Sequence, residues 1–90
     1  SEIGLIYLRR GDFDRGIEHL RSAVRSKPDY APAHFNLSLA LRHVGEFEES
    51  LRHAEEVLRI NPDFPRGRRL RDELVAARER AAGSETDGEP

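Results

Sequence analysis

The stretch GDFDRGI at residues 11–17 returns 34 residues later as GEFEESL at residues 45–51. Both stretches carry a glycine, an acidic residue, a phenylalanine and a second acidic residue in the same order. Aligning residues 1–30 with residues 35–64 needs no gap and gives seven identical pairs. The pairs are Leu5/Leu39, Gly11/Gly45, Phe13/Phe47, His19/His53, Arg25/Arg59, Pro28/Pro62 and Asp29/Asp63. A constant period of this length predicts a stack of repeated supersecondary units.

Each copy contains two apolar stripes with helical spacing, separated by the glycine of the repeated stretch. In the second copy the stripe before Gly45 consists of Ala33, Leu37, Ala40, Leu41 and Val44. The stripe after Gly45 consists of Phe47, Leu51, Ala54 and Leu58. Steps of three and four residues place each set on one face of an α-helix. Pro28 and Pro62 predict where each pair of helices ends, because proline cannot continue a helix.

Two small residues, Gly16 and Ser50, occupy equivalent places inside the second predicted helix of each copy. Glycine in a helix costs about 1 kcal/mol relative to alanine, so its presence needs a compensating reason. We expect the small side chains to let the two helices of each pair cross closely.

The third element begins as a further copy and then departs from it. Residues 65–82 carry one narrow apolar stripe, formed by Leu70, Leu74, Ala77 and Ala81, and are otherwise rich in charge. A helix with a polar outer face is what closes the end of a repeat array, so this segment is predicted to be a capping helix. The last stretch, GSETDGEP at residues 83–90, is small, polar and acidic, and we expect it to be disordered.

These features resemble the tetratricopeptide repeat family. In the second copy, residues 31–64, the matching positions are Leu37, Ser38, Leu41, Gly45, Phe47, Ser50, Ala54 and Pro62. In the first copy, residues 1–30, which lacks its opening four residues, they are Ile3, Gly4, Tyr7, Gly11, Phe13, Gly16, Leu20, Ala23 and Pro28. His34 and Val57 depart from the usual tryptophan and alanine. The resemblance implies an all-α fold, a right-handed helix-turn-helix solenoid (an α-α superhelix) of two hairpins followed by the capping helix.

Composition excludes several classes of protein. Charged residues make up 36% of the chain, hydrophobic residues 37%, and the net charge is −2, so no overall positive field attracts nucleic acid or anionic lipid. The absence of cysteine excludes disulfides and cysteine zinc sites. No apolar run approaches the roughly 20 residues of a membrane span, and the first residues do not form a signal peptide. We therefore expect no membrane association. The sequence does not specify a compartment, although a cytoplasmic location is favoured.

No arrangement of residues predicts catalysis. None of the four histidines forms the helical His pair with a glutamate that a zinc hydrolase requires. Glu49 and His53 share a helix face, and we interpret them as a solvated side-chain pair. The chain has no phosphate-binding glycine loop and no nucleophile motif. We therefore predict that the protein is not an enzyme and has no cofactor or metal site.

The run RGRRLR at residues 66–71 is the strongest basic cluster of the chain. Three interpretations of this run are open. It forms a solvated face of the capping helix that pairs with Asp72 and Glu73 one turn away, or it forms a rim that receives carboxylates of a partner, or it binds nucleic acid. The run contains no aromatic residue and acidic residues follow it directly, so we expect no nucleic acid to bind.

The resemblance also implies a binding surface, because first helices of such repeats line a concave groove that receives an extended peptide or a partner's helix. The residues at these places are Leu5, Leu8, Arg9, Phe35, Asn36, Leu39, Arg42, His43, Arg66 and Arg69. Their apolar middle and arginine border suit a protein or peptide partner with hydrophobic anchors and acidic groups. The function implied is that of a scaffold or adaptor module for protein–protein interaction.

A structural role is the alternative. The first predicted helix carries Ile3, Leu5, Ile6 and Leu8, which is more apolar surface than one neighbouring helix covers. The chain would then be the C-terminal end piece of a larger array, and its uncapped N-terminal helix would self-associate, giving a homodimer.

Overall fold

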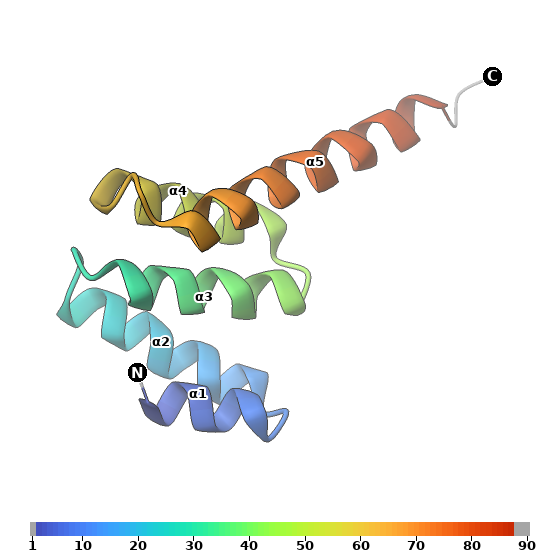
Figure 1. Ribbon diagram of the computed structural model, residues 1–90. Coiled ribbons are helices and arrows are strands. Elements are labelled where there is room, and N and C mark those ends of the chain that lie inside the picture. The colour runs from blue at the N-terminus through green and yellow to red at the C-terminus, as the bar shows by residue number, and fades with distance from the viewer. Residues whose placement is uncertain (1, 88–90) are drawn as a thin grey trace.

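The computed structural model describes residues 2–87, which form five α-helices and no strand (Figure 1). In chain order they are α1 (Glu2–Arg9), α2 (Phe13–Ser26), α3 (Ala31–His43), α4 (Phe47–Ile60) and α5 (Pro65–Asp87). Each helix packs on the next one in the chain, so α1/α2 and α3/α4 are hairpins and α5 lies against α4. The expected all-α helical solenoid is confirmed. Within these residues, no helix combines the length and the apolar character that crossing a membrane requires.

The repeated glycines end the first helix of each hairpin in the same way. Gly11 has a φ of 81° and Gly45 a φ of 88°, in the left-handed region where a side chain would be strained. In each turn the following N–H reaches back to a carbonyl five residues earlier, from Asp12 to Tyr7 and from Glu46 to Leu41, both at 2.9 Å. These bonds satisfy carbonyls that the helix end leaves free.

Small residues lie where the two helices of each hairpin cross closely, as predicted. A Cβ atom on Gly16 would lie 2.6 Å from Cδ2 of Leu8 and 3.0 Å from the carbonyl oxygen of Gly4, so α1 and α2 leave no space for a side chain. At the equivalent crossing of α3 and α4, the Ser50 hydroxyl donates to the Ser38 carbonyl and the Ser38 hydroxyl to the Ser50 carbonyl, both at 2.7 Å. The two hydroxyls are buried and fully satisfied by this exchange.

The hydrophobic core consists of two clusters, and α3 contributes to both. The cluster nearer the N-terminus contains Ile17, Leu20, Leu37, Ala40 and Leu41, with Leu8, Phe13 and Val24 packed against it. The cluster nearer the C-terminus contains Ala31, Phe35, Leu51, Ala54, Val57, Leu70 and Leu74, with Leu39, Ile60, Phe64 and Val75 packed against it. Because α3 is shared, the first hairpin and the α4/α5 pair are built on opposite sides of one central helix.

The end of α5 differs from the prediction. The sequence analysis ended the capping helix at residue 82 and assigned residues 83–90 to a disordered tail, whereas α5 continues to Asp87. Residues 88–90 lie outside the described part of the chain. Glycine at 83 weakens a helix by about 1 kcal/mol but keeps the backbone N–H that the helix needs. Proline, which removes that donor, first occurs in this region at residue 90. In Figure 1 the C-terminal half of α5 extends well beyond α3 and α4.

Candidate functional site

A groove of about 240 Å³ lies between α3 and α5. The residues that line it are Phe35, Leu39 and Arg42 from α3 and Arg66, Arg69, Leu70 and Glu73 from α5. The three α3 residues share one face because they are spaced at helical intervals, and Arg66, Arg69, Leu70 and Glu73 do the same on α5. The groove therefore forms where the last hairpin meets the capping helix.

Phe35 forms the apolar floor of this groove. Its ring is buried in the core and packs against the ring of Phe64, with ring centroids 5.3 Å apart. The guanidinium carbon of Arg66 lies 4.7 Å from the centroid of the Phe35 ring, a distance typical of a cation–π contact. Leu39, one turn further along α3, continues the floor and is partly buried. The floor is thus fixed by the core, and Arg66 is held above it.

The charged side chains around the groove are mainly positive. Arg42 on α3 forms an ion pair with Glu73 on α5, with Nη1 3.1 Å from Oε2, and this contact joins the two walls. Arg66 and Arg69 have no carboxylate of their own in the groove lining. Three arginines therefore face a single glutamate, and the surplus favours an acidic group in a ligand.

The structure brings together five of the ten candidate groove residues. These are Phe35, Leu39, Arg42, Arg66 and Arg69. Leu70 and Glu73 also line the groove but were not among the ten candidates. The 34-residue period relates Asn36 to Leu70 and Leu39 to Glu73, so the sequence does place both residues at positions equivalent to candidates.

The other five candidates lie outside this groove. Leu8 packs against the N-terminal core cluster, where the missing side chain of Gly16 leaves room for it. His43 stacks on Phe13 of α2, with ring centroids 4.2 Å apart. Leu5 and Asn36 are partly buried and Arg9 is exposed, and none of the three lines the groove. Neighbouring residues of the first hairpin thus engage Leu8 and His43 before a ligand could.

The arginines at residues 66–71 find partners other than those expected. No pair one turn apart with Asp72 or Glu73 joins them; instead Glu73 pairs with Arg42 of α3. Arg71 pairs with the adjacent Asp72 at 3.0 Å, and Arg68 donates to the Pro62 carbonyl at 3.2 Å. The expected pairing one turn apart was wrong, because Glu73 accepts from Arg42 of α3, Arg68 donates to the turn before α5, and Asp72 pairs with the adjacent Arg71.

A second polar cluster joins three helices on the other side of α3. Arg21 of α2 donates two hydrogen bonds to the Glu49 carboxylate, one of them at 3.0 Å. Nε2 of His53 lies 3.7 Å from Glu49, and Nδ1 of His53 lies 3.0 Å from Nδ1 of the buried His34. Glu49 and His53 do form the expected side-chain pair, but α2 and α3 cover this face of α4, so the pair is mostly buried and not solvated.

The environment of this cluster changes the proton affinities of its members. Burial lowers the pKa of His53 below its ordinary value, and the neighbouring His34 lowers it further, while Glu49 acts in the opposite direction. The hydrogen bonds from Arg21 hold the pKa of Glu49 below its ordinary value. The described residues contain no group of three or more acidic or histidine side chains arranged to hold a metal ion.

A sequence profile and a curated relative identify the family of this chain. The sequence profile of the tetratricopeptide repeat matches residues 2–65. The chloroplastic tetratricopeptide repeat domain-containing protein PYG7 of Arabidopsis thaliana is 35% identical over 74 residues, which cover 82% of this chain and 25% of that protein. An uncharacterized protein of Methanocaldococcus jannaschii is 39% identical over 41 residues, which cover 46% of this chain and 48% of that protein.

A solved structure is similar over most of the chain. The crystal structure of MamA protein superimposes with a TM-score of 0.68 at 26% identity, covering 92% of this chain and 51% of the MamA chain. This chain therefore spans between about a quarter and a half of the length of the proteins that it matches.

Proposed function

Because this chain belongs to the tetratricopeptide repeat family, whose members in general are protein–protein interaction modules, we propose that it is a scaffold or adaptor that binds a peptide or a partner's helix. The proposed binding site is the groove between α3 and α5. Domains of this family are generally non-catalytic, and we propose no catalytic role for this one.

One observation carries the proposal: an apolar floor and a surplus of arginine occur together in the groove. Phe35 and Leu39 offer apolar surface to a hydrophobic side chain. Arg66 and Arg69 stand at the α5 wall, and Arg66 is already positioned by its contact with the Phe35 ring. Arginine binds carboxylates in a two-pronged geometry, so a ligand with an acidic residue next to a hydrophobic one fits both features.

The test is a selection of short peptides from a phage-displayed library on the immobilised protein. We expect the selected peptides to combine acidic residues with an apolar one. Their binding should weaken about tenfold or more in the double variant Arg66→Glu/Arg69→Glu, since charge reversal changes attraction into repulsion. The matched control is Arg25→Glu, which reverses an exposed arginine on α2, away from the groove. Equal losses in the control and the groove variant, or selected peptides without acidic residues, would contradict the proposal.

Self-association is a second candidate, and the exposure of α1 favours it. Ile3 and Ile6 are 55% and 47% exposed, whereas Ala40 and Leu74, which follow Ile6 at one and two repeat periods, are 3% and 2% exposed. Those two residues are covered because a second helix of a hairpin precedes them in the stack. The face of α1 that carries Ile6 therefore has the position of a helix interface.

Sedimentation of the chain and of its Ile6→Glu variant tests this second candidate. A dimer of the original chain that becomes a monomer in the variant supports self-association through α1. A monomeric original chain at micromolar concentration would exclude it, and the groove proposal would be unaffected.

A further inference from the structure

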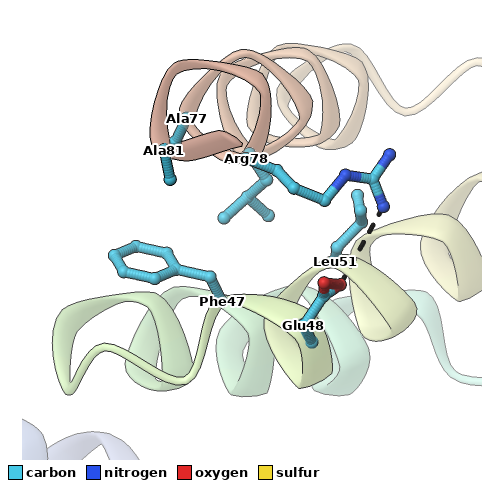
Figure 2. Close-up of a pocket in the computed structure, with 7 residues that line it drawn as sticks. Phe47, Glu48, Leu51, Ala77, Arg78 and Ala81 are labelled. Atoms are coloured by element: carbon cyan, nitrogen blue, oxygen red, sulfur yellow. Dashed lines mark ion pairs between the residues drawn. The ribbon is translucent and has the colours of Figure 1, made fainter. Parts of the chain in front are cut away.

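A second hollow, of about 270 Å³, lies between the N-terminal turns of α4 and the C-terminal half of α5 (Figure 2). Its walls are Phe47, Glu48 and Leu51 from α4 and Leu74, Ala77, Arg78 and Ala81 from α5. Figure 2 shows Phe47 on the α4 side facing Ala77 and Ala81 of α5. The Phe47 side chain is 48% exposed, although Leu51 and Leu74 beside it belong to the core.

The first hairpin shows what fills the equivalent place. Phe13 precedes Phe47 by one repeat period, and its ring is stacked on the ring of His43, with centroids 4.2 Å apart and planes 15° from parallel. One repeat period after His43 comes Ala77. The hollow therefore exists because a methyl group stands where the preceding repeat has an aromatic ring.

We propose that this hollow binds an aromatic side chain from a partner protein, stacked on Phe47 as His43 is stacked on Phe13. Offset stacking is the arrangement that aromatic pairs prefer, and the hollow already presents the Phe47 ring beside apolar walls. The site is distinct from the groove between α3 and α5, and it does not depend on the function proposed for that groove.

The charged residues at the rim of the hollow indicate which side chains should flank the aromatic residue in the partner's segment. Arg78 and Glu48 form an exposed ion pair at 3.9 Å beside the hollow. Exposed pairs of this kind are held together weakly, so each member can exchange its partner for an opposite charge on a ligand. The complementary segment carries its aromatic residue between one acidic and one basic side chain.

The hollow holds one aromatic ring and is too small to form a stable protein interface by itself. A single aromatic side chain buries about 150–250 Å². A stable protein interface buries about 1,200 Å² or more in total. Among the described residues, Tyr30 is the exposed tyrosine or phenylalanine besides Phe47 that a second copy could insert, and the Lys27 ammonium already lies 5.7 Å from its ring centroid. One inserted ring is therefore an anchor within a larger contact with another protein.

The first test uses N-acetyl-tryptophanamide as the probe and NMR of alanine methyl groups and phenylalanine rings as the readout. At millimolar probe we expect ring-current shifts at the Ala77 and Ala81 methyls, and none with N-acetyl-alaninamide. The variant Ala77→His, which supplies the missing ring from within the chain, should lose the shift at the Ala81 methyl. The variant His43→Ala should gain a second site, detected at the Phe13 ring. Absence of shifts at Ala77 and Ala81 in the original chain, or an Ala81 shift that persists in Ala77→His, would overturn the proposal.

The second test asks which molecule supplies the ring. Short peptides from a phage-displayed library are selected on the original chain and counter-selected on Ala77→His. We expect a fixed aromatic residue flanked by one acid and one base, with unchanged binding to Arg66→Glu/Arg69→Glu. Enrichment without an aromatic residue would overturn the proposal. A dimer of the original chain that Ala77→His dissociates would also overturn it, because a second copy would then fill the hollow.

Discussion

Gly16 lies where α2 crosses α1, and its missing side chain is what allows the crossing. The nearest atoms to a Cβ at this position belong to Leu8 and to the backbone of Gly4, and the backbone cannot rotate away as a side chain can. The second hairpin solves the same problem with a buried pair of serines, which exchange hydrogen bonds with each other's carbonyl groups. Side-chain size at these places therefore sets the separation of the helices within each hairpin.

The variant Gly16→Val should lower the free energy of unfolding by about 1–3 kcal/mol, because the added atoms overfill a close contact. Urea unfolding followed by circular dichroism measures the change. The control is Ser22→Val, at an exposed position of the same helix, which we expect to change stability by about 0.5 kcal/mol or less. Equal effects of the two substitutions would contradict the role assigned to Gly16.

His53 is expected to make the stability of the fold depend on pH. It faces His34 of α3, Arg21 of α2, and Glu49 and Arg52 of its own helix. Nε2 of His34 lies 2.8 Å from the Pro28 carbonyl, which can only accept, so a neutral His34 has its Nδ1 free to accept from Nδ1 of His53. Protonation of His53 then adds charge to a partly buried ring beside another histidine.

The lowered pKa of His53 means that the unfolded chain binds the proton more readily than the folded chain does. The stability contributed by neutral His53 is present above about pH 6.5, the ordinary pKa of histidine, and is lost as the pH falls through the folded value. Thermal unfolding should therefore show a melting temperature that decreases between about pH 7 and pH 5.

The variant His53→Asn, which keeps an N–H donor and removes the titration, should show a smaller decrease over this interval. His19→Asn, the same change one repeat earlier at an exposed site, should retain the original decrease. A decrease that is identical in the original chain and in His53→Asn would assign the effect to other groups.

At the scale of elements, α5 is the helix whose contacts depart most from the repeat. Its stripe of Leu70 and Leu74 packs on α4 as a first helix of a repeat should, but Ala77 leaves Phe47 uncovered. The variant Ala77→His should raise the free energy of unfolding by about 0.5–1.5 kcal/mol, the range of an added aromatic pair. Urea unfolding tests this against Arg80→His, which places the same residue on the exposed side of α5. If the two variants were equally stable, no stacking on Phe47 would occur.

Most element boundaries follow from signals that occur twice in the sequence. Gly11 and Gly45 end α1 and α3 with the same backbone geometry, and the turns at Pro28 and Pro62 separate the hairpins. These features are local, so the residues themselves determine them. The end of α5 was missed because glycine and polar residues weaken a helix without stopping it.

The candidate site was less predictable because it depends on contacts between helices. Periodicity identifies which face of α1 or α3 a residue occupies, but not which neighbouring side chain reaches it first. Leu8 of α1 packs against Gly16, and His43 of α3 stacks on Phe13. Gly16 and Phe13 both belong to α2, so contacts with this helix occupy the two candidates. The polar cluster of Arg21, Glu49 and His53 was missed for the same reason, because it draws on separate helices.

At the scale of the whole molecule, the helices form a linear stack in which each contacts mainly its neighbours. In such a stack stability is a sum of units and of the interfaces between them, so a helix at an end, with one neighbour, opens before a helix between two neighbours. α1 has eight residues and packs mainly on α2, whereas α3 takes part in both core clusters.

Native-state hydrogen exchange should therefore show weaker protection in α1 than in α3. Mass spectrometry of proteolytic fragments from exchanged protein resolves the two helices. Equal protection in α1 and α3 would indicate a single cooperative unit and contradict the linear stack.

The succession of Phe13, His43, Phe47 and Ala77 has a consequence for building longer molecules from this one. A duplicate of residues 31–64 inserted after Phe64 would place its own histidine against Phe47. The hollow would then lie one repeat further along, beside the duplicated phenylalanine. The chain could in this way be lengthened one repeat at a time, and each extended version would still have one open aromatic-binding hollow, always beside its final helix.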